Sequence, residues 1–392
     1  MLNIAGPDEP GPDGDVTGPS ADCSAGPKEP TSRFGLTQGP RFVGRFSARG
    51  QFAWSGSEVN ARFTGASLGA TIELPAADPT TYNPAKDGRV FSVTVDGRTS
   101  ELAARPGRAL YTLAEGLDPS PSVIHEVTLR REFEANGGLG RFEGFVLAPG
   151  GTFDVPRVRP RRMEVIGDSI SCGYGVLGGD GSCVFTYGTE RHSLTYAAIA
   201  ASTLDAELTN VCWSGKGLSR NDNGDDGGEP SKDNPAVQAE AMPELFSSLA
   251  PKAVLGTPPE GIPYVFPKDL APQAVLVHLG TNDFNFGVAD ATFERRGVEF
   301  LAKIRAQYPD AHLFVALSPM LSNTNGPDIR TRAGVSLRKI VERSGDSRAY
   351  FMEFVEQRSA RDGLGCDGHP SRRTQEIAAA QLVKAIQKKL CW

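Results

Sequence analysis

From Pro160 to the C-terminus, short apolar runs alternate with stretches of helical periodicity, and this alternation limits the fold more than any other feature. Each run is almost continuously apolar, which is typical of a strand buried on both faces of a parallel sheet. The runs are MEVIG, ELTNVCW, AVLVHLG, HLFVALS and AYFMEF, and the helical stretches include TYAAIAASTL, ATFERRGVEFLAKIRAQY and TQEIAAAQLVKAIQKKL. The pattern predicts a three-layer, doubly wound α/β domain with a parallel sheet over residues 162–392.

The preceding part of the chain, residues 33–152, has a different period. Short runs rich in Val, Phe, Thr and Arg alternate apolar and polar residues and are separated by Gly, Pro and Asp. Examples are GQFAWSG, EVNARFTG, GATIELP, RVFSVTVDG, HEVTLRREF and RFEGFVLAPGG. This period of two predicts antiparallel strands, and we expect an all-β sandwich of jelly-roll type.

Two further segments complete the predicted organisation. Residues 1–32 are dominated by Pro, Gly, Asp and Ser, and we expect a disordered tail because so little apolar surface is available for burial. Residues 153–161 (FDVPRVRPR) contain two prolines and no Gly or Ser run, which predicts a short, stiff linker. Such a linker should hold the sandwich against the edge of the α/β domain that carries the active site.

Composition excludes several classes of partner. A net charge of −6 and a pI near 5.6 provide no basic surface for nucleic acid. No run approaches the roughly 18–20 apolar residues of a membrane span. The six cysteines form no CxxC pair, which argues against structural zinc.

Cys172 and Cys183 bracket a Gly-rich loop that a disulfide between them could close; independent thiols are the alternative.

Four chemically useful groups follow strands or precede the last helix. Ser169 ends Gly-Asp-Ser directly after the first strand, Gly215 lies in Ser-Gly-Lys-Gly after the second, and Asn282 lies in Gly-Thr-Asn-Asp after the third. His369 lies in Asp-Gly-His-Pro before the final helix. Together they provide a hydroxyl, a backbone N–H, an amide and an imidazole, the groups that acyl transfer requires.

These motifs and their order resemble the SGNH (GDSL) hydrolase superfamily over roughly residues 162–390. By that resemblance Ser169 is the nucleophile and His369 is the general base. The backbone N–H groups of Ser169 and Gly215 and the side chain of Asn282 form the oxyanion hole. No metal or organic cofactor is required by these groups.

A narrower resemblance covers about residue 34 to the C-terminus. The segment GDSISCGYG, the SGKG turn and a preceding β-domain with FAWSGS and LRREFEAN are similar to carbohydrate esterase family 2. This resemblance implies an extracellular or cell-surface acetyl esterase that acts on plant polysaccharide such as acetylated xylan or mannan. The alternatives are a lipid esterase or thioesterase of the GDSL type, and a carbohydrate-binding surface protein without catalysis.

The acidic member of the predicted triad departs from the superfamily pattern. Many SGNH hydrolases have Asp three residues before the histidine, where this chain has Cys366, and the nearest carboxylate is Asp367. We expect Asp367 to orient the imidazole of His369, and a backbone carbonyl in a Ser–His dyad is the alternative. A histidine base predicts activity that rises with a pKa near 6–7.

Two other glycine motifs lack the structural context that their chemistry requires. Residues 65–69 match G-x-S-x-G but lie between β-patterned runs, whereas that motif needs a strand, a turn and a helix. Residues 173–178 match G-x-G-x-x-G, but a loop follows them and not the helix that would bind a pyrophosphate. We therefore expect neither to be a site.

Overall fold

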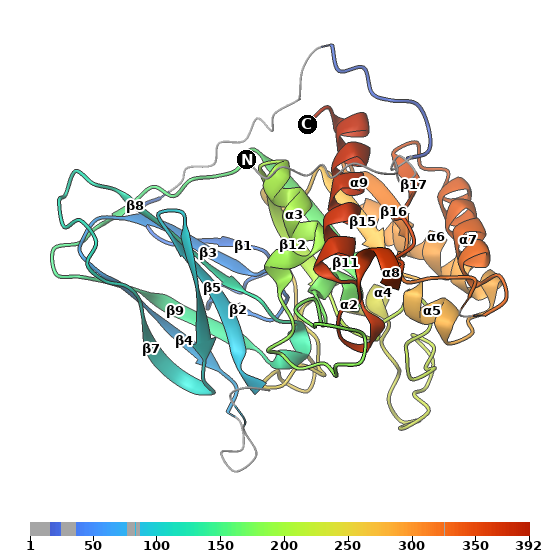
Figure 1. The fold of residues 1–392 in the computed structure, drawn as a ribbon, viewed down its shortest axis with the longest axis horizontal. Helices are drawn as coiled ribbons and strands as arrows, with labels where there is room; N and C mark the ends of the chain where they lie inside the picture. The colour runs from blue at the N-terminus through green and yellow to red at the C-terminus, as the bar shows by residue number, and fades with distance from the viewer. Residues whose placement is uncertain (1–15, 25–36, 77–82, 84–86, 325) are drawn as a thin grey trace.

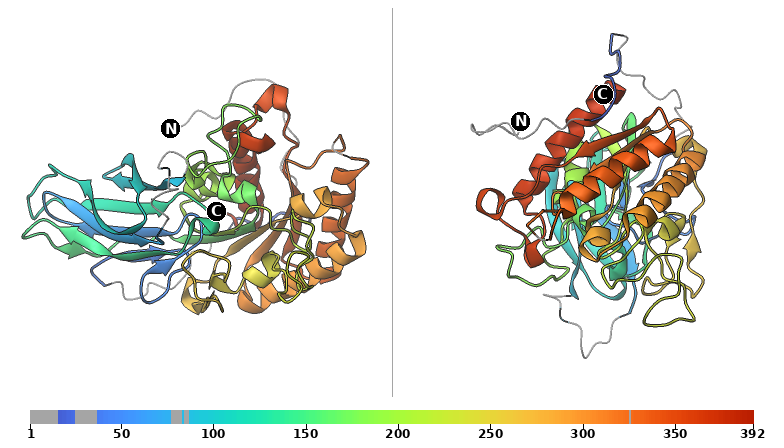
Figure 2. Two further views of the ribbon diagram at one scale, coloured as in Figure 1. Left: turned by 90° about the horizontal axis from the view of Figure 1, so that it is seen from below. Right: turned by 90° about the vertical axis from the view of Figure 1, so that its right-hand side faces the viewer.

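The computed structural model describes residues 16–24, 37–76, 83, 87–324 and 326–392. These residues form an antiparallel β-domain and a parallel α/β domain, which lie side by side along the long axis of the molecule (Figures 1 and 2). The predicted fold class, a β-sandwich followed by a doubly wound α/β domain, is confirmed.

The β-domain consists of two antiparallel sheets that enclose one apolar core. One sheet has the order β1-β3-β8-β5-β6 with β10 paired to β3, and the other has the order β2-β9-β4-β7. Along β4 the buried residues alternate with half-buried ones, as the period of two predicts. The strands are β1 (Arg41–Val43), β2 (Gln51–Phe52), β3 (Glu58–Phe63), β4 (Leu68–Leu74), β5 (Arg89–Val95), β6 (Arg98–Ala104), β7 (Gly107–Ala114), β8 (His125–Arg131), β9 (Gly140–Leu147) and β10 (Phe153–Asp154).

The α/β domain is built on a parallel sheet of order β12-β11-β15-β16-β17. Its strands are β11 (Arg161–Gly167), β12 (Ala206–Cys212), β15 (Ala274–His278), β16 (His312–Leu317) and β17 (Ala349–Glu353). All five coincide with the apolar runs of the sequence. The second strand, β12, is added on one side of β11, and the third strand, β15, is added on the other side. The order in which strands are added therefore reverses at β11. Open α/β sheets bind their ligands in the crevice at such a switch point.

Helices cover both faces of this sheet (Figure 1). Leu276 and Phe314 pack with α3 and α9 on one face, whereas Val275 and Val315 pack with α6 and α7 on the other. The helices are α2 (Ser169–Cys172), α3 (Tyr196–Thr203), α4 (Met242–Leu245), α5 (Thr281–Asn285), α6 (Asp290–Gln307), α7 (Ile329–Ser344), α8 (Ser359–Asp362) and α9 (Arg372–Leu390). Among the described residues, no helix combines the length and apolar character needed to cross a membrane.

Residues 16–24 of the predicted tail lie on the α/β domain. Val16 is buried in the core beside α9, and Thr17 N–H donates to Phe351 O of β17 at 2.9 Å. A disulfide joins Cys23 to Cys391. In this stretch the structure differs from the expected disordered tail, because a buried valine and a disulfide hold a segment that is otherwise mostly polar. Residues 1–15 and 25–32 lie outside the described part of the chain.

Arg45 of the sandwich forms a buried ion pair with the α/β domain. Its guanidinium is fully buried and lies 2.9 Å from the carboxylate of Glu164 in β11. It also donates to the carbonyls of Phe246 and Ser248 and lies over the ring of Tyr264. The interface therefore buries a charge that only the two domains together neutralise, and the domains are expected to unfold as one unit.

We predict that Arg45→Ala lowers the free energy of unfolding by about 3–5 kcal/mol, because it leaves the buried carboxylate of Glu164 without its counter-charge. Chemical denaturation followed by tryptophan fluorescence measures the change. The control is Arg295→Ala, whose partner Glu299 is 59% exposed, and its cost should stay below about 1 kcal/mol. Equal effects of the two variants would contradict the role of the interface.

Candidate active site

The candidate site begins where three neighbouring parallel strands end in register. Gly167, the last residue of β11, pairs with Cys212 at the end of β12 and with His278 at the end of β15. The loops that follow start at the same level of the sheet edge. This register brings Ser169, Gly215 and Asn282 to one edge, although they are far apart in sequence.

Ser169 is the first residue of α2, a helix of 4 residues. The preceding residue, Asp168, caps this helix, because its carboxylate accepts a hydrogen bond from Ile170 N–H at 3.0 Å. The hydroxyl Oγ of Ser169 lies 2.9 Å from Nε2 of His369. The structure therefore brings the predicted hydroxyl and imidazole within hydrogen-bonding distance across 200 residues of sequence.

Aromatic and acidic groups surround the imidazole of His369. The ring of Tyr174 stacks on it with centroids 4.0 Å apart, and Phe185 stacks on the far side of Tyr174. The carboxylate of Asp367 accepts hydrogen bonds from the Tyr174 hydroxyl at 2.7 Å and from Phe185 N–H at 2.9 Å. Nδ1 of His369 is buried and has no hydrogen-bond partner among the described residues. The geometry thus differs from the expectation that Asp367 binds Nδ1 directly.

Burial of the imidazole lowers the pKa of His369 to about 4. The backbone of Cys366, the charge of Asp367 and the backbone of Asp367 oppose this shift without cancelling it. His369 is consequently neutral over the physiological pH range, and Nε2 can accept a proton from Ser169.

The turn after β12 supplies a glycine in a conformation that other residues avoid. Gly215 has φ 78°, and a Cβ at this position would lie 2.3 Å from the carboxylate of Asp222. Its carbonyl accepts Asp222 N–H at 2.9 Å. Among the described residues, neither Gly215 N–H nor Ser169 N–H donates to another group of the chain. Both N–H groups are therefore free to bind a ligand.

Asn282 lies in α5, and its amide nitrogen donates to the carbonyl of Lys216 at 2.9 Å. That contact uses one of the two amide hydrogens and leaves the other available. The structure therefore places Gly215 and Asn282, the other two predicted oxyanion donors, on the segments that follow the two strands flanking the strand before Ser169.

Asp283 binds the backbone of the segment that follows this turn. Its buried carboxylate accepts backbone N–H groups from the three residues of the segment 218–220 at 2.9, 2.6 and 2.8 Å. Burial raises the pKa of Asp283 to about 6 and that of Asp168 to about 7. Sequence analysis did not identify Asp283, although its place beside Asn282 in Gly-Thr-Asn-Asp is the signal that could have found it.

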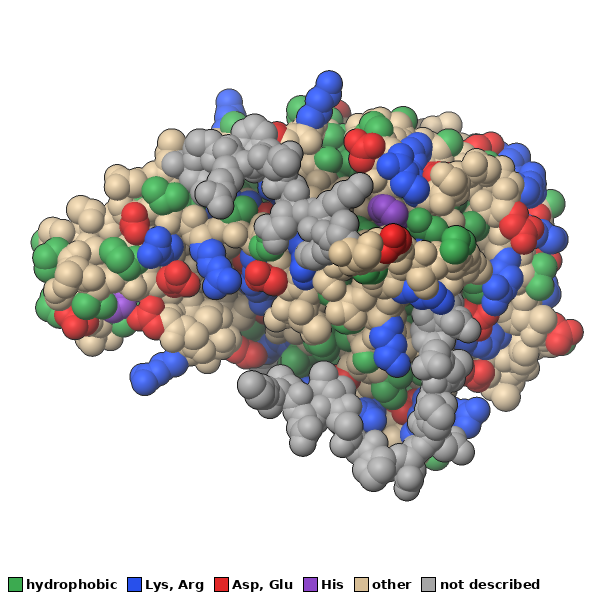
Figure 3. Space-filling view, turned by 90° about the horizontal axis from the view of Figure 1, so that it is seen from above, with side chains coloured by type: hydrophobic (Ala, Val, Ile, Leu, Met, Phe, Trp, Pro, Cys, Tyr) green, Lys and Arg blue, Asp and Glu red, His purple; other side chains and the backbone are tan. Residues whose placement is uncertain are grey.

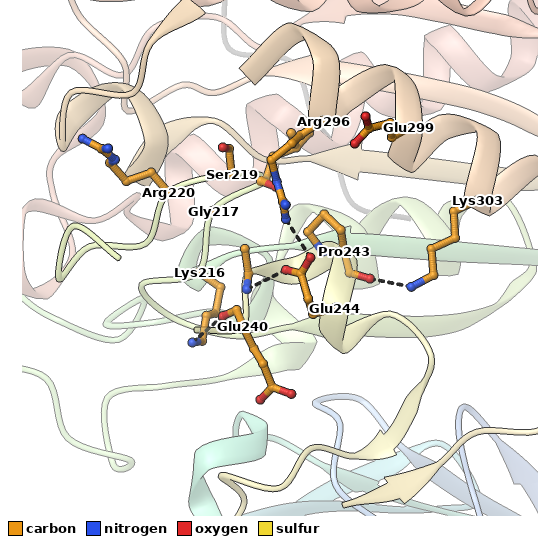
Figure 4. Close-up of polar contacts among 12 residues, drawn as sticks. Lys216, Gly217, Ser219, Arg220, Glu240, Pro243, Glu244, Arg296, Glu299 and Lys303 are labelled. Carbon is orange, nitrogen blue, oxygen red and sulfur yellow. Dashed lines mark hydrogen bonds and ion pairs between the residues drawn. The ribbon is translucent and has the colours of Figure 1, made fainter. Parts of the chain in front are cut away.

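The segment before α4 binds the residues that directly follow Gly215 in the turn (Figure 4). Lys216 Nζ donates to Glu240 O at 2.8 Å, and Met242 N–H donates to Gly217 O at 2.9 Å. Glu244 fixes this segment by accepting Ala241 N–H at 2.9 Å and pairing with Arg296 of α6 at 2.7 Å. The loop that carries Gly215 is therefore held by contacts at successive residues.

Two disulfides cross-link the site, and neither is the pair considered from the sequence. Cys172, the last residue of α2, is bonded to Cys212 at the end of β12. Cys183 is bonded to Cys366, three residues before His369. A bond between Cys172 and Cys183 is therefore excluded, and so are independent thiols. The sequence could not show this, because Cys172 faces the neighbouring strand, and the loop around Cys183 lies against the segment before His369.

The described residues contain one cluster of possible metal ligands, formed by Glu134, Cys172 and Glu190. The sulfur of Cys172 is in a disulfide, so two carboxyl groups remain, whereas protein metal sites of this kind typically use three or four ligands. Lys and Arg side chains are interspersed with Asp and Glu on the face in Figure 3. Neither feature indicates a metal centre or a nucleic-acid interface.

The sequence also missed Tyr174, which stacks on His369. It lies within the glycine motif at residues 173–178, which lacks the following helix that a nucleotide site needs. The aromatic residue two positions after the end of the nucleophile helix was the available signal. Its partner His369 is 195 residues further along the chain, so only the folded structure shows the stack.

Comparison with known proteins identifies both domains. The family described as Carbohydrate esterase 2 N-terminal matches residues 42–156, and the GDSL-like Lipase/Acylhydrolase family matches residues 165–377. The cellulase/esterase CelE of Acetivibrio thermocellus is 33% identical over 87% of this chain, and the match spans 38% of that protein. An acetylxylan esterase / glucomannan deacetylase of Cellvibrio japonicus is 25% identical over 77% of this chain and 79% of its own length.

Solved structures agree with these matches over both domains. A family two carbohydrate esterase from Clostridium thermocellum in complex with cellohexaose is 30% identical, with a TM-score of 0.76 over 90% of this chain and 100% of that chain. A carbohydrate esterase family 2 enzyme from Corynascus thermopiles is 29% identical, with a TM-score of 0.74 and the same coverage. The chain therefore belongs to the GDSL-like lipase/acylhydrolase family and, within it, to carbohydrate esterase family 2.

Proposed function

We propose that this protein is a serine esterase that removes acetyl groups from carbohydrate through an acyl-enzyme on Ser169. The observation that carries the proposal is the 2.9 Å contact between Ser169 Oγ and Nε2 of His369, at a sheet edge where the N–H groups of Ser169 and Gly215 donate to no other described group. A hydroxyl activated by a neutral imidazole beside preorganised donors is the arrangement that acyl transfer requires.

In the first half of the reaction, Ser169 Oγ attacks the carbonyl carbon of the acetyl ester, and His369 Nε2 takes the hydroxyl proton. Negative charge then develops on the carbonyl oxygen. The N–H groups of Ser169 and Gly215 and the free amide hydrogen of Asn282 stabilise this charge. The intermediate collapses when the sugar oxygen leaves with the proton from His369.

The second half repeats the same chemistry with water. His369 takes a proton from a water molecule, which attacks the acetylated Ser169, and the same donors hold the second oxyanion. Collapse releases acetate and returns the proton to Ser169 Oγ. The buried turn around Gly215 need not reorganise between the two halves, because its backbone is held by Asp283 and Asp222 throughout.

Relatives support carbohydrate as the substrate class. The Cellvibrio japonicus relative is described as an acetylxylan esterase / glucomannan deacetylase, and one solved relative holds cellohexaose. We therefore propose acetylated plant polysaccharide, such as acetylated xylan or mannan, as the substrate. Lipid ester or thioester hydrolysis, and carbohydrate binding without catalysis, remain the alternative functions that assays must separate.

We also propose that the protein acts outside the cell. Three disulfides link the six cysteines, and bonds of this kind persist in oxidising compartments and are rare in the cytosol. A polymeric substrate is consistent with this location.

For Asp367 we propose a supporting role and not that of a triad acid. Its carboxylate holds Tyr174 and Phe185, and Tyr174 in turn packs against the imidazole of His369. Asp367 thus fixes the stacking partner, and its charge favours the imidazolium that forms during the reaction. The proposed site is then a Ser–His dyad in which Tyr174 packs against the imidazole, whereas the dyad considered from the sequence assigned that support to a backbone carbonyl.

Ser169→Ala is expected to abolish release of acetate from acetylated xylan and of p-nitrophenol from p-nitrophenyl acetate, with the melting temperature unchanged. The matched control is Ser171→Ala in the same helix, because that hydroxyl bonds Tyr196. It should keep its activity and lose about 1 kcal/mol of stability. Ser169→Ala activity above a few per cent would refute the nucleophile assignment, and faster turnover of a phospholipid by the wild type would favour the lipid alternative.

The lowered pKa of His369 predicts an acid limb of kcat/KM near pH 4, not near 6–7 as the sequence alone suggested. Only the neutral imidazole accepts the proton of Ser169, so activity rises as pH increases through this pKa and is level from about pH 6 to 8. Because a carboxyl group could produce the same limb, the imidazole is also titrated by NMR, with His369→Ala assigning its signal. An imidazole that titrates above pH 6 would contradict the structure.

Asp367→Asn tests the dyad. Asparagine keeps an oxygen that can accept from Tyr174 and Phe185, so we expect kcat to fall by less than about tenfold, whereas loss of a triad acid costs up to roughly 10⁴-fold. The control is Asp180→Asn on the neighbouring loop, where the carboxylate binds Ser182, and it should leave kcat unchanged. A loss of a thousandfold or more would restore Asp367 as the triad acid.

A further inference from the structure

Glu134 extends from the sandwich domain to the turn that carries Gly215. It directly precedes the 3₁₀ turn η1 (Ala135–Gly137) and is fully buried. Its Oε2 accepts a hydrogen bond from Ser214 N–H at 2.7 Å. Ser214 is the residue immediately before Gly215, so a side chain from the other domain contacts the backbone next to a proposed oxyanion donor.

The backbone around Glu134 is fixed by buried groups. The guanidinium of Arg131 donates to the carbonyls of Phe133, Glu134 and Gly138 at 2.9, 2.7 and 2.8 Å. Glu134 N–H donates to Oε2 of Glu190 at 3.2 Å. A carboxylate on a backbone held this firmly has a defined position before any substrate binds.

The contact with Ser214 constrains the peptide unit next to the one that contains Gly215 N–H, because each peptide unit is planar and moves as a rigid body. The peptide unit that ends in Ser214 N–H is held by Glu134. The unit that begins at Gly215 O is held by Asp222 N–H, at 2.9 Å. Between them lies the single peptide unit that contains Gly215 N–H, so holding both neighbours limits the directions in which this donor can point.

We propose that Glu134 is a positioning residue of the esterase, which the sandwich domain contributes to the oxyanion hole by holding Ser214 N–H. The inference rests on the proposed function, because it assumes that Gly215 N–H binds the oxyanion. It gives the sandwich a part in the chemical step itself. Contact between the sandwich and remote sugar units would affect substrate binding, whereas a misaligned oxyanion donor affects kcat.

Two conservative variants separate the hydrogen bond from the charge. Glu134→Asp keeps the charge but withdraws the carboxylate by one methylene, beyond reach of Ser214 N–H. Glu134→Gln loses the charge but keeps an oxygen at the right reach, and its amide group can face Glu190, a ligand atom of which lies within 4.8 Å. Because losing an oxyanion donor outright costs about 10²–10³-fold, we expect Glu134→Asp to lower kcat by about 10–100-fold and Glu134→Gln by less than about fivefold.

The assay is hydrolysis of p-nitrophenyl acetate by the full chain, with kcat and KM determined separately and the melting temperature recorded. KM should change by less than about threefold in both variants, because the oxyanion forms only after binding. Should Glu134→Asp fail to fold, Glu134→Met fills a similar volume without an accepting oxygen and replaces it.

Glu132→Asp is the matched control. Glu132 is equally buried, lies two residues earlier and accepts Ser193 N–H of the α/β domain at 2.7 Å, so it makes the same kind of contact away from the Gly215 turn. It should lose stability and keep its kcat. The inference would be overturned by an unchanged kcat in Glu134→Asp, by an equal loss in Glu132→Asp, or by a loss in Glu134→Gln as large as in Glu134→Asp. A wild-type chain without esterase activity would instead refute the proposed function.

Discussion

The register of the three central parallel strands is the constraint on which the candidate site depends. Because Gly167 pairs with both Cys212 and His278, the loops after β11, β12 and β15 leave the sheet at one level. A shift of one residue in either pair would turn the apolar side chains of the strand to the wrong face and separate Ser169 from its proposed oxyanion donors. The burial that selects the register therefore also assembles the site.

Buried hydrogen bonds then fix the backbone of the loop that carries Gly215. Carboxylates accept backbone N–H groups on both sides of Gly215 in sequence, from Ser214 at Glu134 of the sandwich and from residues 218–220 at Asp283. Such contacts are strong only when buried, because water would compete for the same groups. The buried ion pair of Arg45 and Glu164 holds the two domains together. The contact of Glu134 with Ser214 therefore depends on the same domain interface.

Much of this arrangement could be predicted from the sequence, and the parts that could not share a physical cause. Strands and long helices follow from local periodicity, and Ser169 and His369 follow from motifs that lie next to predicted elements. The disulfide partner of Cys172, the stack of Tyr174 on His369 and the hydrogen bonds of Asp367 each depend on which distant loops meet. Composition also gives no sign of the contacts of residues 16–24, which depend on one buried side chain, Val16, and on one disulfide to the far end of the chain.

The central proposal is that Ser169 is a nucleophile activated by His369. Covalent trapping tests it most directly: the chain is treated with diethyl p-nitrophenyl phosphate, an acyl-transfer mimic that phosphorylates activated hydroxyl groups, and the modified peptide is identified by mass spectrometry. We expect one diethylphosphoryl group on Ser169 in the wild type and none in His369→Ala. Modification of a different residue, or equal modification of Ser169 without the imidazole, would contradict the proposal.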